Sequence, residues 1–324
     1  MIRDCWYVVL DSREVPRDKP VAFRRLGEDL VFWRDREGNV ACAVDRCPHR
    51  GAQLSAGKVV DGCVECFFHG FRFDDAGACQ LIPANGLKAP IPRAMRVRSF
   101  ACREQGGFVY LWWGERRDAY PPLPSFDKPN DRFAYAQLHE DWPAHISRVV
   151  ENQLDFTHLP FTHASTIGRG VPGELGVNTE VDGDRIRVKY DPEVYDGAKG
   201  FFVELHAPNL WRNRLSDRVW VLAAFVPIDE DNTRTYIRFC QDFVTVPGLG
   251  WLFCWLSNVF NKIVLGQDRK RVISQRPKKT QLDMDEVLVP SDRPIIEYRR
   301  WVDARTDRNE PAAPNASDGA PTST

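Results

Sequence analysis

The segments CPHRG at residues 47–51 and CFFHG at residues 66–70 decide the fold of this chain. Each pairs one cysteine with one histidine, as C-x-H and then C-x-x-H, and sixteen residues separate them from His49 to Cys66. Two such loops can each donate one ligand to each of two irons, which favours a [2Fe–2S] cluster with paired cysteines and paired histidines. The expected cluster ligands are Cys47, His49, Cys66 and His69.

A structural zinc site is the alternative, because two cysteines and two histidines are also a zinc-binding set. Zinc-binding segments usually place like residues together, as C-x2-C and H-x3-H, whereas each segment here mixes the two types. Cys63 forms a C-x2-C pair with Cys66, but His69 stands at the C-x2-H distance only from Cys66. We therefore interpret Cys63 as a neighbour of the site and the mixed segments as ligands of a Rieske-type cluster.

Length and charge exclude several classes of protein. The 324 residues suffice for two domains that each bury a core, and the net charge of -1 argues against a general nucleic-acid-binding protein. Nine cysteines, an odd number, and the lack of an apolar leader at residues 1–7 predict reduced thiols in the cytoplasm. No stretch reaches the roughly 20 apolar residues of a membrane-spanning helix, so no transmembrane segment is expected.

Composition also predicts where the domains divide. Short β-rich runs separated by turn residues fill residues 1–115 and predict an all-β domain over residues 1–118, with both ligand segments at hairpin tips. A proline-rich connector at 120–124 marks the boundary to a second domain over 119–303, and residues 304–324 form a predicted disordered tail. The β-rich runs are 6–10, 21–23, 30–33, 40–44 and 108–113.

The second domain mixes helices and strands. A helix is predicted from about Asp141 to about His158, where Pro160 ends it, and residues 180–245 return to alternating strand patterns. A later helical stretch spans roughly 251–276. The expected fold class is therefore α+β.

A second set of metal ligands lies on and after the first of these helices. Asn152, Asp155 and His158 fall at i, i+3 and i+6, which predicts that they share one side of the helix, and Pro160 can turn His163 back beside His158. Two imidazoles and one carboxylate form the facial triad of non-haem Fe(II) sites. Each histidine alone could be an ordinary polar residue at a helix end. The predicted cluster upstream transfers single electrons and requires an electron acceptor, which favours a metal site at these histidines.

The third ligand of this site must be a carboxylate from elsewhere in the chain. Asp268 is the candidate, because it follows an apolar helical run and can therefore point inward. An ion pair of Asp268 with Arg269 or Arg271 is the alternative interpretation.

The most apolar run of the chain is 251–265. Its polar residues share one helical arc, so the rest of the circumference is apolar, and its fifteen residues extend only about 22 Å. A buried helix or a pocket wall is the favoured interpretation, and a lid or a membrane-contact surface is the alternative. The polar arc of this helix consists of Ser257, Asn258, Asn261 and Lys262. Four residues of the predicted sheet could contact a substrate, but packing is the favoured interpretation for each: His206, Asn209, Trp211 and Trp220.

These motifs together resemble the α subunit of Rieske non-haem iron oxygenases of the single-subunit type, such as phenoxybenzoate, vanillate and dicamba oxygenases. The resemblance rests on both cluster segments, on the pattern N-x-x-D-x-x-H-x4-H at 152–163 and on Gln-Asp at 267–268, and it covers about residues 1–303. It implies a helix-grip-like catalytic domain, with an antiparallel sheet flanked by helices, after the Rieske domain.

The resemblance also implies partners and cofactors. Each chain would hold one [2Fe–2S] cluster and one Fe(II), use O2 as co-substrate, and pass electrons to the next chain of a head-to-tail homotrimer. Asp155 would bridge His158 to His49 or His69 of that neighbour, and Asn152 would lie near the iron. No G-x-G-x-x-G follows a strand, so NAD(P)H would be oxidised by a separate reductase, directly or through a ferredoxin.

The resulting hypothesis is a terminal oxygenase that hydroxylates or oxidatively demethylates a hydrophobic, cyclic or aromatic small molecule. Ring dihydroxylation, monohydroxylation and demethylation use the same ligands. The alternative is a Rieske-type electron carrier or a catalytically inactive scaffold. The segment 152–163 and Asp268 distinguish the two, because a carrier has no use for a second metal site.

Overall fold

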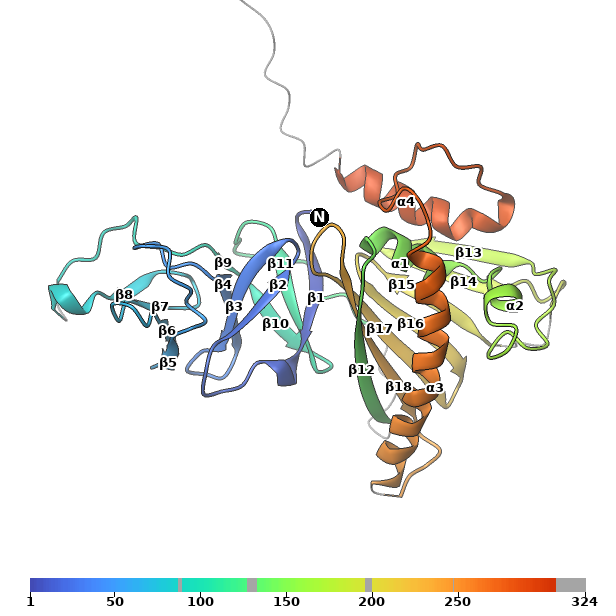
Figure 1. The fold of residues 1–324 in the computed structure, drawn as a ribbon, viewed down its shortest axis with the longest axis horizontal. Helices are drawn as coiled ribbons and strands as arrows, with labels where there is room; N and C mark the ends of the chain where they lie inside the picture. The colour runs from blue at the N-terminus through green and yellow to red at the C-terminus, as the bar shows by residue number, and fades with distance from the viewer. Residues whose placement is uncertain (87–88, 127–132, 196–199, 247, 307–324) are drawn as a thin grey trace, which may run out of the picture.

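Two regions lie side by side in the computed structural model of this chain (Figure 1). The structure describes residues 1–86, 89–126, 133–195, 200–246 and 248–306. The first region contains only strands and short 3-10 turns, and the second combines a large antiparallel sheet with helices. The predicted α+β class, with an all-β region first, is confirmed.

The first region is built from three small antiparallel sheets. One has the order β1-β11-β10, with β1 Cys5–Asp11, β10 Cys102–Gln105 and β11 Phe108–Trp113. The second has the order β2-β3-β4-β9, with β2 Val21–Arg25, β3 Glu28–Arg34, β4 Val40–Val44 and β9 Ser99–Phe100. The third runs β5-β6-β7-β8, with β5 Lys58–Val60, β6 Cys63–Glu65, β7 Arg72–Phe73 and β8 Cys79–Leu81.

The two cluster segments occupy different kinds of loop. Residues 66–70 form the tip of the β6–β7 hairpin, as expected. Residues 47–51 instead lie in the long connection from β4 to β5, which belong to different sheets. The prediction of two hairpin tips is therefore wrong for the first segment, because its flanking strands do not pair with each other. Short 3-10 turns also occur at η1 Ser12–Glu14, η2 Pro83–Asn85 and η3 Pro290–Asp292.

The second region is a seven-stranded antiparallel sheet of order β12-β18-β17-β16-β15-β14-β13. Its strands alternate between two packing faces. Ala223 and Phe225 point into a core shared with the helices, whereas Ala224 and Val226 point into a core shared with the first region. The strands are β12 Ala134–Trp142, β13 Val177–Asp182, β14 Arg185–Tyr190, β15 Phe202–His206, β16 Leu210–Ser216, β17 Val219–Pro227 and β18 Thr233–Gln241.

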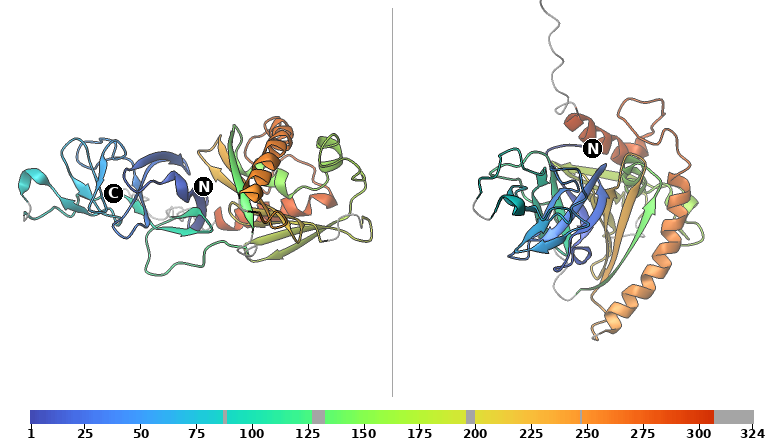
Figure 2. Two further views of the ribbon diagram at one scale, coloured as in Figure 1. Left: turned by 90° about the horizontal axis from the view of Figure 1, so that it is seen from below. Right: turned by 60° about the vertical axis from the view of Figure 1, so that its left-hand side comes forward.

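The helices of the second region lie on the face of the sheet that is turned away from the first region. The right-hand view of Figure 2 shows the first region and the long helix α3 on opposite sides. Side chains lock the two regions together: Asn209 binds both the N–H and the carbonyl of Val8, at 3.0 and 2.8 Å. The helices are α1 Ile146–Leu154, α2 Leu159–Thr162, α3 Leu249–Val272 and α4 Arg293–Thr306.

The predicted helix from Asp141 to His158 is wrong at both ends. Strand β12 pairs with β18 as far as Trp142, so α1 starts only at Ile146, where the His145 side chain accepts a hydrogen bond from the N–H of Ser147. The helix ends at Leu154, and a second short helix, α2, follows.

The later helical prediction differs from the structure only at its ends, whereas helix α4 was not predicted. Helix α3 spans 249–272 against the predicted 251–276. Helix α4 continues to Thr306, past the predicted start of the disordered tail at 304. Residues 307–324 of that predicted tail lie outside the described residues.

Candidate metal centres

The two cluster loops have the same backbone hydrogen bonds. In each loop the cysteine N–H donates to the carbonyl five residues ahead at 2.8 Å, and the glycine four residues ahead donates to the cysteine carbonyl at 2.9 Å. Gly51 and Gly70 have φ angles of 76° and 71°, a conformation that glycine adopts without strain. Cys47 and Cys66 are therefore presented by matched turns, as two halves of one site.

The four predicted cluster ligands are arranged as sulfur inside and imidazole outside. Cys47 and Cys66 are 3% and 2% exposed, whereas His49 and His69 are exposed, with ring centroids 4.7 Å apart. Burial raises the pKa of the Cys47 thiol to about 11, although the backbone N–H of His49 lowers it in part. A pair of buried thiols needs a cationic partner to ionise, and the exposed imidazoles give such a cluster an edge for electron transfer.

A zinc ion and a two-iron cluster place different demands on the spacing of their ligand atoms. A tetrahedral zinc would bring all four ligand atoms within about 4 Å of one another, because its bonds are about 2.0–2.3 Å long. Within the described residues, the group whose ligand atoms all lie within 4.8 Å is instead His158, His163 and Asp268. The preference for a cluster over zinc at residues 47–69 therefore rests on the mixed Cys–His segments and their matched loops.

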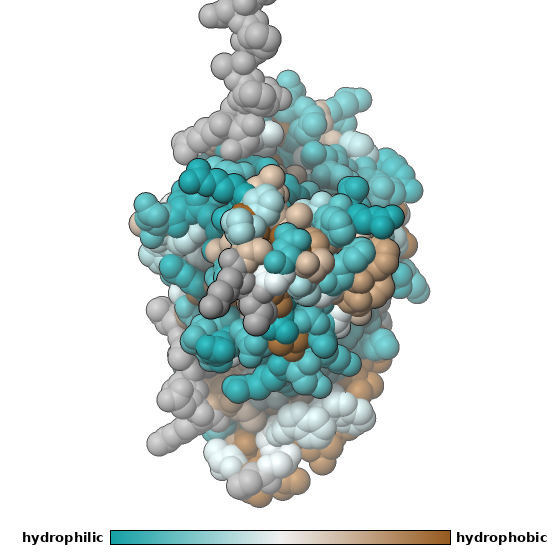
Figure 3. Space-filling view, turned by 90° about the vertical axis from the view of Figure 1, so that its left-hand side faces the viewer, coloured by the Kyte–Doolittle hydropathy of each residue, from teal (hydrophilic) through white to brown (hydrophobic). Residues whose placement is uncertain are grey.

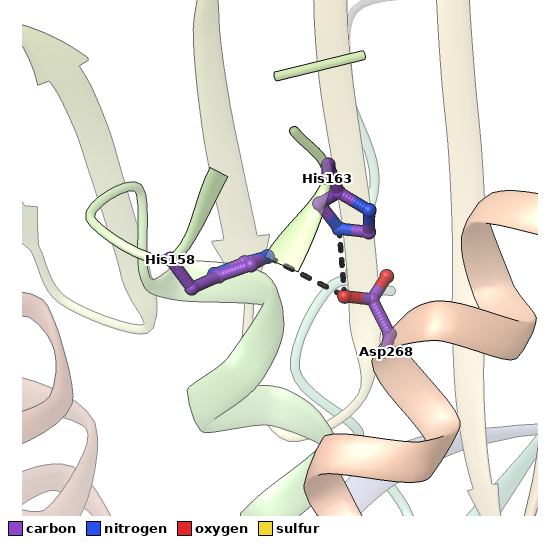
Figure 4. Close-up of side chains that lie close together, drawn as sticks. All are labelled: His158, His163 and Asp268. Carbon is purple, nitrogen blue, oxygen red and sulfur yellow. Dashed lines mark hydrogen bonds and ion pairs between the residues drawn. The ribbon is translucent and has the colours of Figure 1, made fainter. Parts of the chain in front are cut away.

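The second site brings two imidazoles and one carboxylate together from two helices (Figure 4). His158 Nε2 and His163 Nε2 lie 3.4 and 2.9 Å from the same atom, Asp268 Oδ1. The two rings are 5.2 Å apart and inclined at 62°. Asp268 is buried on α3 and faces the histidines rather than Arg269 or Arg271. The structure thus brings together the three residues that the sequence predicts as ligands.

Helix α2 positions both histidines. It has four residues, so His158 immediately precedes it and His163 immediately follows it. The N–H of His163 donates to the carbonyl of Leu159 at 3.0 Å, and the N–H of Gly168 donates to the carbonyl of His163 at 3.0 Å. A Cβ atom at Gly168 would lie 1.9 Å from the carbonyl oxygen of Leu159, so only glycine allows this close return of the chain.

Gln267 fixes the orientation of His163, a role that the sequence prediction missed. Its Oε1 atom lies 2.7 Å from His163 Nδ1 and also accepts a hydrogen bond from Thr166 Oγ1 at 2.8 Å. An amide oxygen can only accept, so Nδ1 carries the ring proton and Nε2 keeps a lone pair directed at the site. The sequence offered one indication of this role, because Gln267 directly precedes the predicted ligand Asp268.

Asp155 lies beside His158 at ion-pair distance, a looser contact than the hydrogen bond between Gln267 and His163. Its Oδ2 atom lies 3.4 Å from His158 Nδ1, and its Oδ1 atom accepts from the N–H and the Oγ1 of Thr157 at 2.6 and 2.7 Å. Thr157 therefore holds Asp155 in place, and sequence reasoning did not single it out. Asp155 caps the end of α1 and lies outside the helix, because the chain leaves helical geometry there.

Charges in this second site balance one another. Burial by itself lowers the pKa of His158, but Asp155 and Asp268 outweigh burial and raise it to about 9. Burial raises the pKa of Asp268, and the two imidazoles lower it by more, so this carboxylate is ionised. Ionised oxygen and imidazole nitrogen on one face are the ligand set of non-haem Fe(II), so the residues fit that ion.

A cavity of about 290 Å³ opens beside the three ligands. Asn152, on α1, lines this cavity, and its Oδ1 atom accepts a hydrogen bond from Gln153 Nε2 at 2.9 Å. The predicted helix face shared by Asn152, Asp155 and His158 does not exist, because α1 ends at Leu154. Trp211 also lines the cavity, so the packing interpretation is incomplete for this residue. The remaining wall is mainly apolar and aromatic, with Phe156, Tyr190, Tyr195, Phe201, Val203, Val221, Ile237, Val264 and Leu265.

The other predicted sheet residues pack elsewhere. His206 contacts the backbone of Ser125 at 3.1 Å, and Asn209 holds the two regions together through Val8. Trp220 lies against the guanidinium of Arg214. None of these three is among the residues that line the cavity in the described structure.

The fold and the two sites define a Rieske-type protein with a second, mononuclear metal site. Residues 5–100 match the Rieske [2Fe-2S] domain, and residues 142–308 match the vanillate O-demethylase oxygenase C-terminal domain. The chain belongs to the Rieske non-haem iron oxygenases.

Individual relatives agree with this assignment. Methylxanthine N3-demethylase NdmB of Pseudomonas putida is 30% identical, with 93% of this chain and 88% of that protein covered. The solved structure of NdmA from Pseudomonas putida CBB5 is 27% identical, with a TM-score of 0.78 over 93% of this chain and 89% of that one. Chlorophyllide a oxygenase of Chlamydomonas reinhardtii is 30% identical over 93% of this chain, which spans only 48% of that protein's length.

Proposed function

We propose that this chain is a terminal oxygenase that hydroxylates or oxidatively demethylates a hydrophobic, cyclic or aromatic small molecule. The observation that carries the proposal is the position of His158, His163 and Asp268 at the wall of an apolar cavity. Fe(II) held there would supply O2 activation, with electrons delivered through the cluster.

The side chains of this chain would do the remaining work. The aromatic wall, including Phe156, Tyr190 and Trp211, would hold a flat ring beside the metal ligands and exclude water from it. Asn152 supplies a polar contact at the same wall. A cavity of about 290 Å³ suits a small ring system, and its few polar groups would set the orientation of the substrate.

A head-to-tail homotrimer is part of the proposal. The strands that carry the cluster loops, β5–β8, lie at one end of the chain and α2 lies at the other, so the two sites of one chain are far apart (Figure 1). The cluster end exposes Phe67 and Phe68 beside the two histidines, and Phe161 on α2 is 73% exposed. Asp155 would then bridge His158 to His49 or His69 of the neighbouring chain.

Electrons would come from a separate NAD(P)H-dependent reductase, directly or through a ferredoxin, in the cytoplasm. The G-x-G-x-x-G string at 168–173 follows α2 rather than a strand, so it lacks the context of a dinucleotide site. All nine cysteines are unpaired, which is compatible with a reducing compartment.

The deciding experiment measures iron and acid-labile sulfide per chain in anaerobically purified protein, wild type beside His158→Ala. Three irons and two sulfides are expected, falling to two irons in the variant with an unchanged cluster spectrum. Two irons in both proteins after incubation with Fe(II) would favour the electron carrier. Tightly bound zinc without sulfide would exclude both the terminal oxygenase and the electron carrier.

The trimer has its own test by light scattering. Wild type should have the native mass of three chains, and the pair Phe68→Asp and Phe161→Asp should have the mass of one chain while retaining cluster absorbance. A monomeric wild type, with its cluster intact, would contradict the trimer and leave the metal sites unaffected.

A further inference from the structure

The first half of α3 presents large apolar side chains to solvent. Leu252, Leu256, Val259 and Ile263 follow one another at spacings of four and three residues, so they form one stripe along the helix, and each is 42–56% exposed. Two tryptophans at 251 and 255 flank the stripe and are 55% and 49% exposed. A helix surrounded by water would carry polar residues at these positions.

The polarity of this helix is reversed relative to a water-exposed helix. Its buried side contains Cys254, Asn258, Leu265 and Asp268, and Asn258, which accepts a hydrogen bond from Asn261 Nδ2 at 3.1 Å, is only 6% exposed. Most of the polar arc noted in the sequence thus faces the protein, and the apolar arc faces outward. The favoured prediction of a buried helix is therefore wrong for the first half of α3.

The chain segment that forms this surface carries charge of a single sign. Between Phe243 and Gln267 the sequence contains no acidic residue. Lys262 lies beside the apolar stripe, and three consecutive basic residues follow on exposed positions of the last turn. Within the described residues, none of these four basic side chains makes an ion pair. They are Lys262, Arg269, Lys270 and Arg271.

The surface also projects from the body of the protein. Figure 1 places the start of α3 at the lower end of the molecule, and Figure 3 shows hydrophobic side chains gathered at that end. The preceding loop adds Phe243, whose ring packs at 5.0 Å against Phe253 of the helix, and the exposed Val246. By length and composition α3 could cross a membrane, but Asp268 belongs to the metal site, so its second half is committed to the protein.

We propose that the first half of α3 docks on the surface of an anionic lipid bilayer. The apolar stripe and the tryptophans would enter the boundary between acyl chains and headgroups, where amphipathic helices bind. Arg269 lies six residues beyond Ile263, or about 9 Å along the helix, so the basic residues follow the apolar stripe at one end of it. The unpaired basic residues would then lie at the level of the lipid phosphates.

The test is sedimentation of the full chain with vesicles of phosphatidylcholine, with and without phosphatidylglycerol. Wild type should bind the vesicles that contain phosphatidylglycerol, and binding should fall at least tenfold in the double variant Leu256→Gln, Ile263→Gln. Lys270→Glu with Arg271→Glu should weaken binding to the anionic vesicles and remove its dependence on salt. The matched control is Val181→Gln with Val287→Gln, which changes two exposed apolar residues elsewhere and should bind as wild type does.

Two outcomes would overturn the proposal. Equal vesicle binding by wild type and by the double glutamine variant would place the contact elsewhere. Lipid-free association of wild-type chains that the double glutamine variant lacks, without vesicle binding by either, would show that a second copy covers this face. Cluster absorbance and circular dichroism check that each variant is folded, so neither outcome depends on oxygenase activity.

Discussion

The two metal-ligand sets of this chain are held in place by different kinds of contact. The cluster cysteines stand on two loops with the same backbone hydrogen bonds, and their partner histidines are exposed. The ligands of the second site are positioned by α2 and also by other side chains, because Gln267 fixes His163, and Asp155, which Thr157 holds, lies at ion-pair distance from His158. The cluster site is therefore determined by the path of the backbone, and the second site by the backbone around α2 together with side-chain contacts to its ligands.

This difference predicts which substitutions damage which site. Each site should fail when the glycine that permits its close backbone approach is replaced, but the cluster site should tolerate changes to nearby side chains. A site held by side chains should respond to conservative changes that leave the backbone alone.

The largest effects are expected from two matched glycine substitutions. A Cβ atom at Gly57 would lie 1.9 Å from the carbonyl oxygen of Glu65, directly before Cys66, and at Gly168 it would lie equally close to Leu159. Each Ala variant should lose about 1–3 kcal/mol or more of stability. Gly57→Ala should lose cluster absorbance and keep metal binding at the second site, and Gly168→Ala should do the reverse.

Gly266→Ala is the control for this pair. This glycine lies in α3, and no atom lies within 4 Å of an added Cβ, so both sites should remain intact. If Gly57→Ala and Gly168→Ala each lost both metal sites, the two sites would not be held independently of each other.

A smaller effect is expected from Gln267→Leu, which removes the acceptor facing His163 Nδ1 without changing the backbone. Affinity of the second site for Fe(II) or Co(II) should fall by about 10- to 100-fold, as is typical when a ligand histidine loses its supporting hydrogen bond. Gln267→Glu, which keeps an acceptor, should lose less. Metal titration followed by absorbance measures this, and an unchanged affinity in Gln267→Leu would remove the positioning role.

The smallest effect concerns pH and the start of α1. Burial lowers the pKa of His145 to about 4, and Glu230 opposes this only in part, so the folded chain binds the proton less well than the unfolded chain. Stability is therefore retained above pH 6.5 and lost as pH falls from there toward 4, by about 1 kcal/mol at pH 5.5. His145→Asn keeps a capping acceptor and should flatten this part of the stability curve. Thermal unfolding between pH 5 and 7 measures this, and the same dependence of stability on pH in wild type and His145→Asn would contradict the role of His145.

Much of the architecture follows from local sequence signals. The cluster ligands are recognisable because all four lie between residues 47 and 69, and their turns carry glycines at the required positions. The β-rich runs became strands because alternating and aromatic segments between turn residues rarely form anything else. The sequence could point to His158, His163 and Asp268, which the structure brings together, because two imidazoles and one carboxylate are the ligand set of a mononuclear iron.

The remainder depends on contacts distant in the sequence. Trp142 belongs to a strand because β18 pairs with it, and no local signal near Pro143 reveals that partner. The role of Gln267 requires His163 to be in place, 104 residues earlier. Asn258 shows the same limit, since helical periodicity describes two faces of α3 but not which of them meets the sheet.

The position of Asp268 has a consequence for folding. A metal ion bound to His163 and Asp268 joins residues that are 105 positions apart, and so acts as a reversible cross-link around a long stretch of chain. A covalent cross-link that closes a loop of that length restricts the unfolded chain and so raises its free energy, which stabilises the folded state by about 4–5 kcal/mol. Chelation should therefore loosen the attachment of α3 to the rest of the second region, in addition to removing its chemistry.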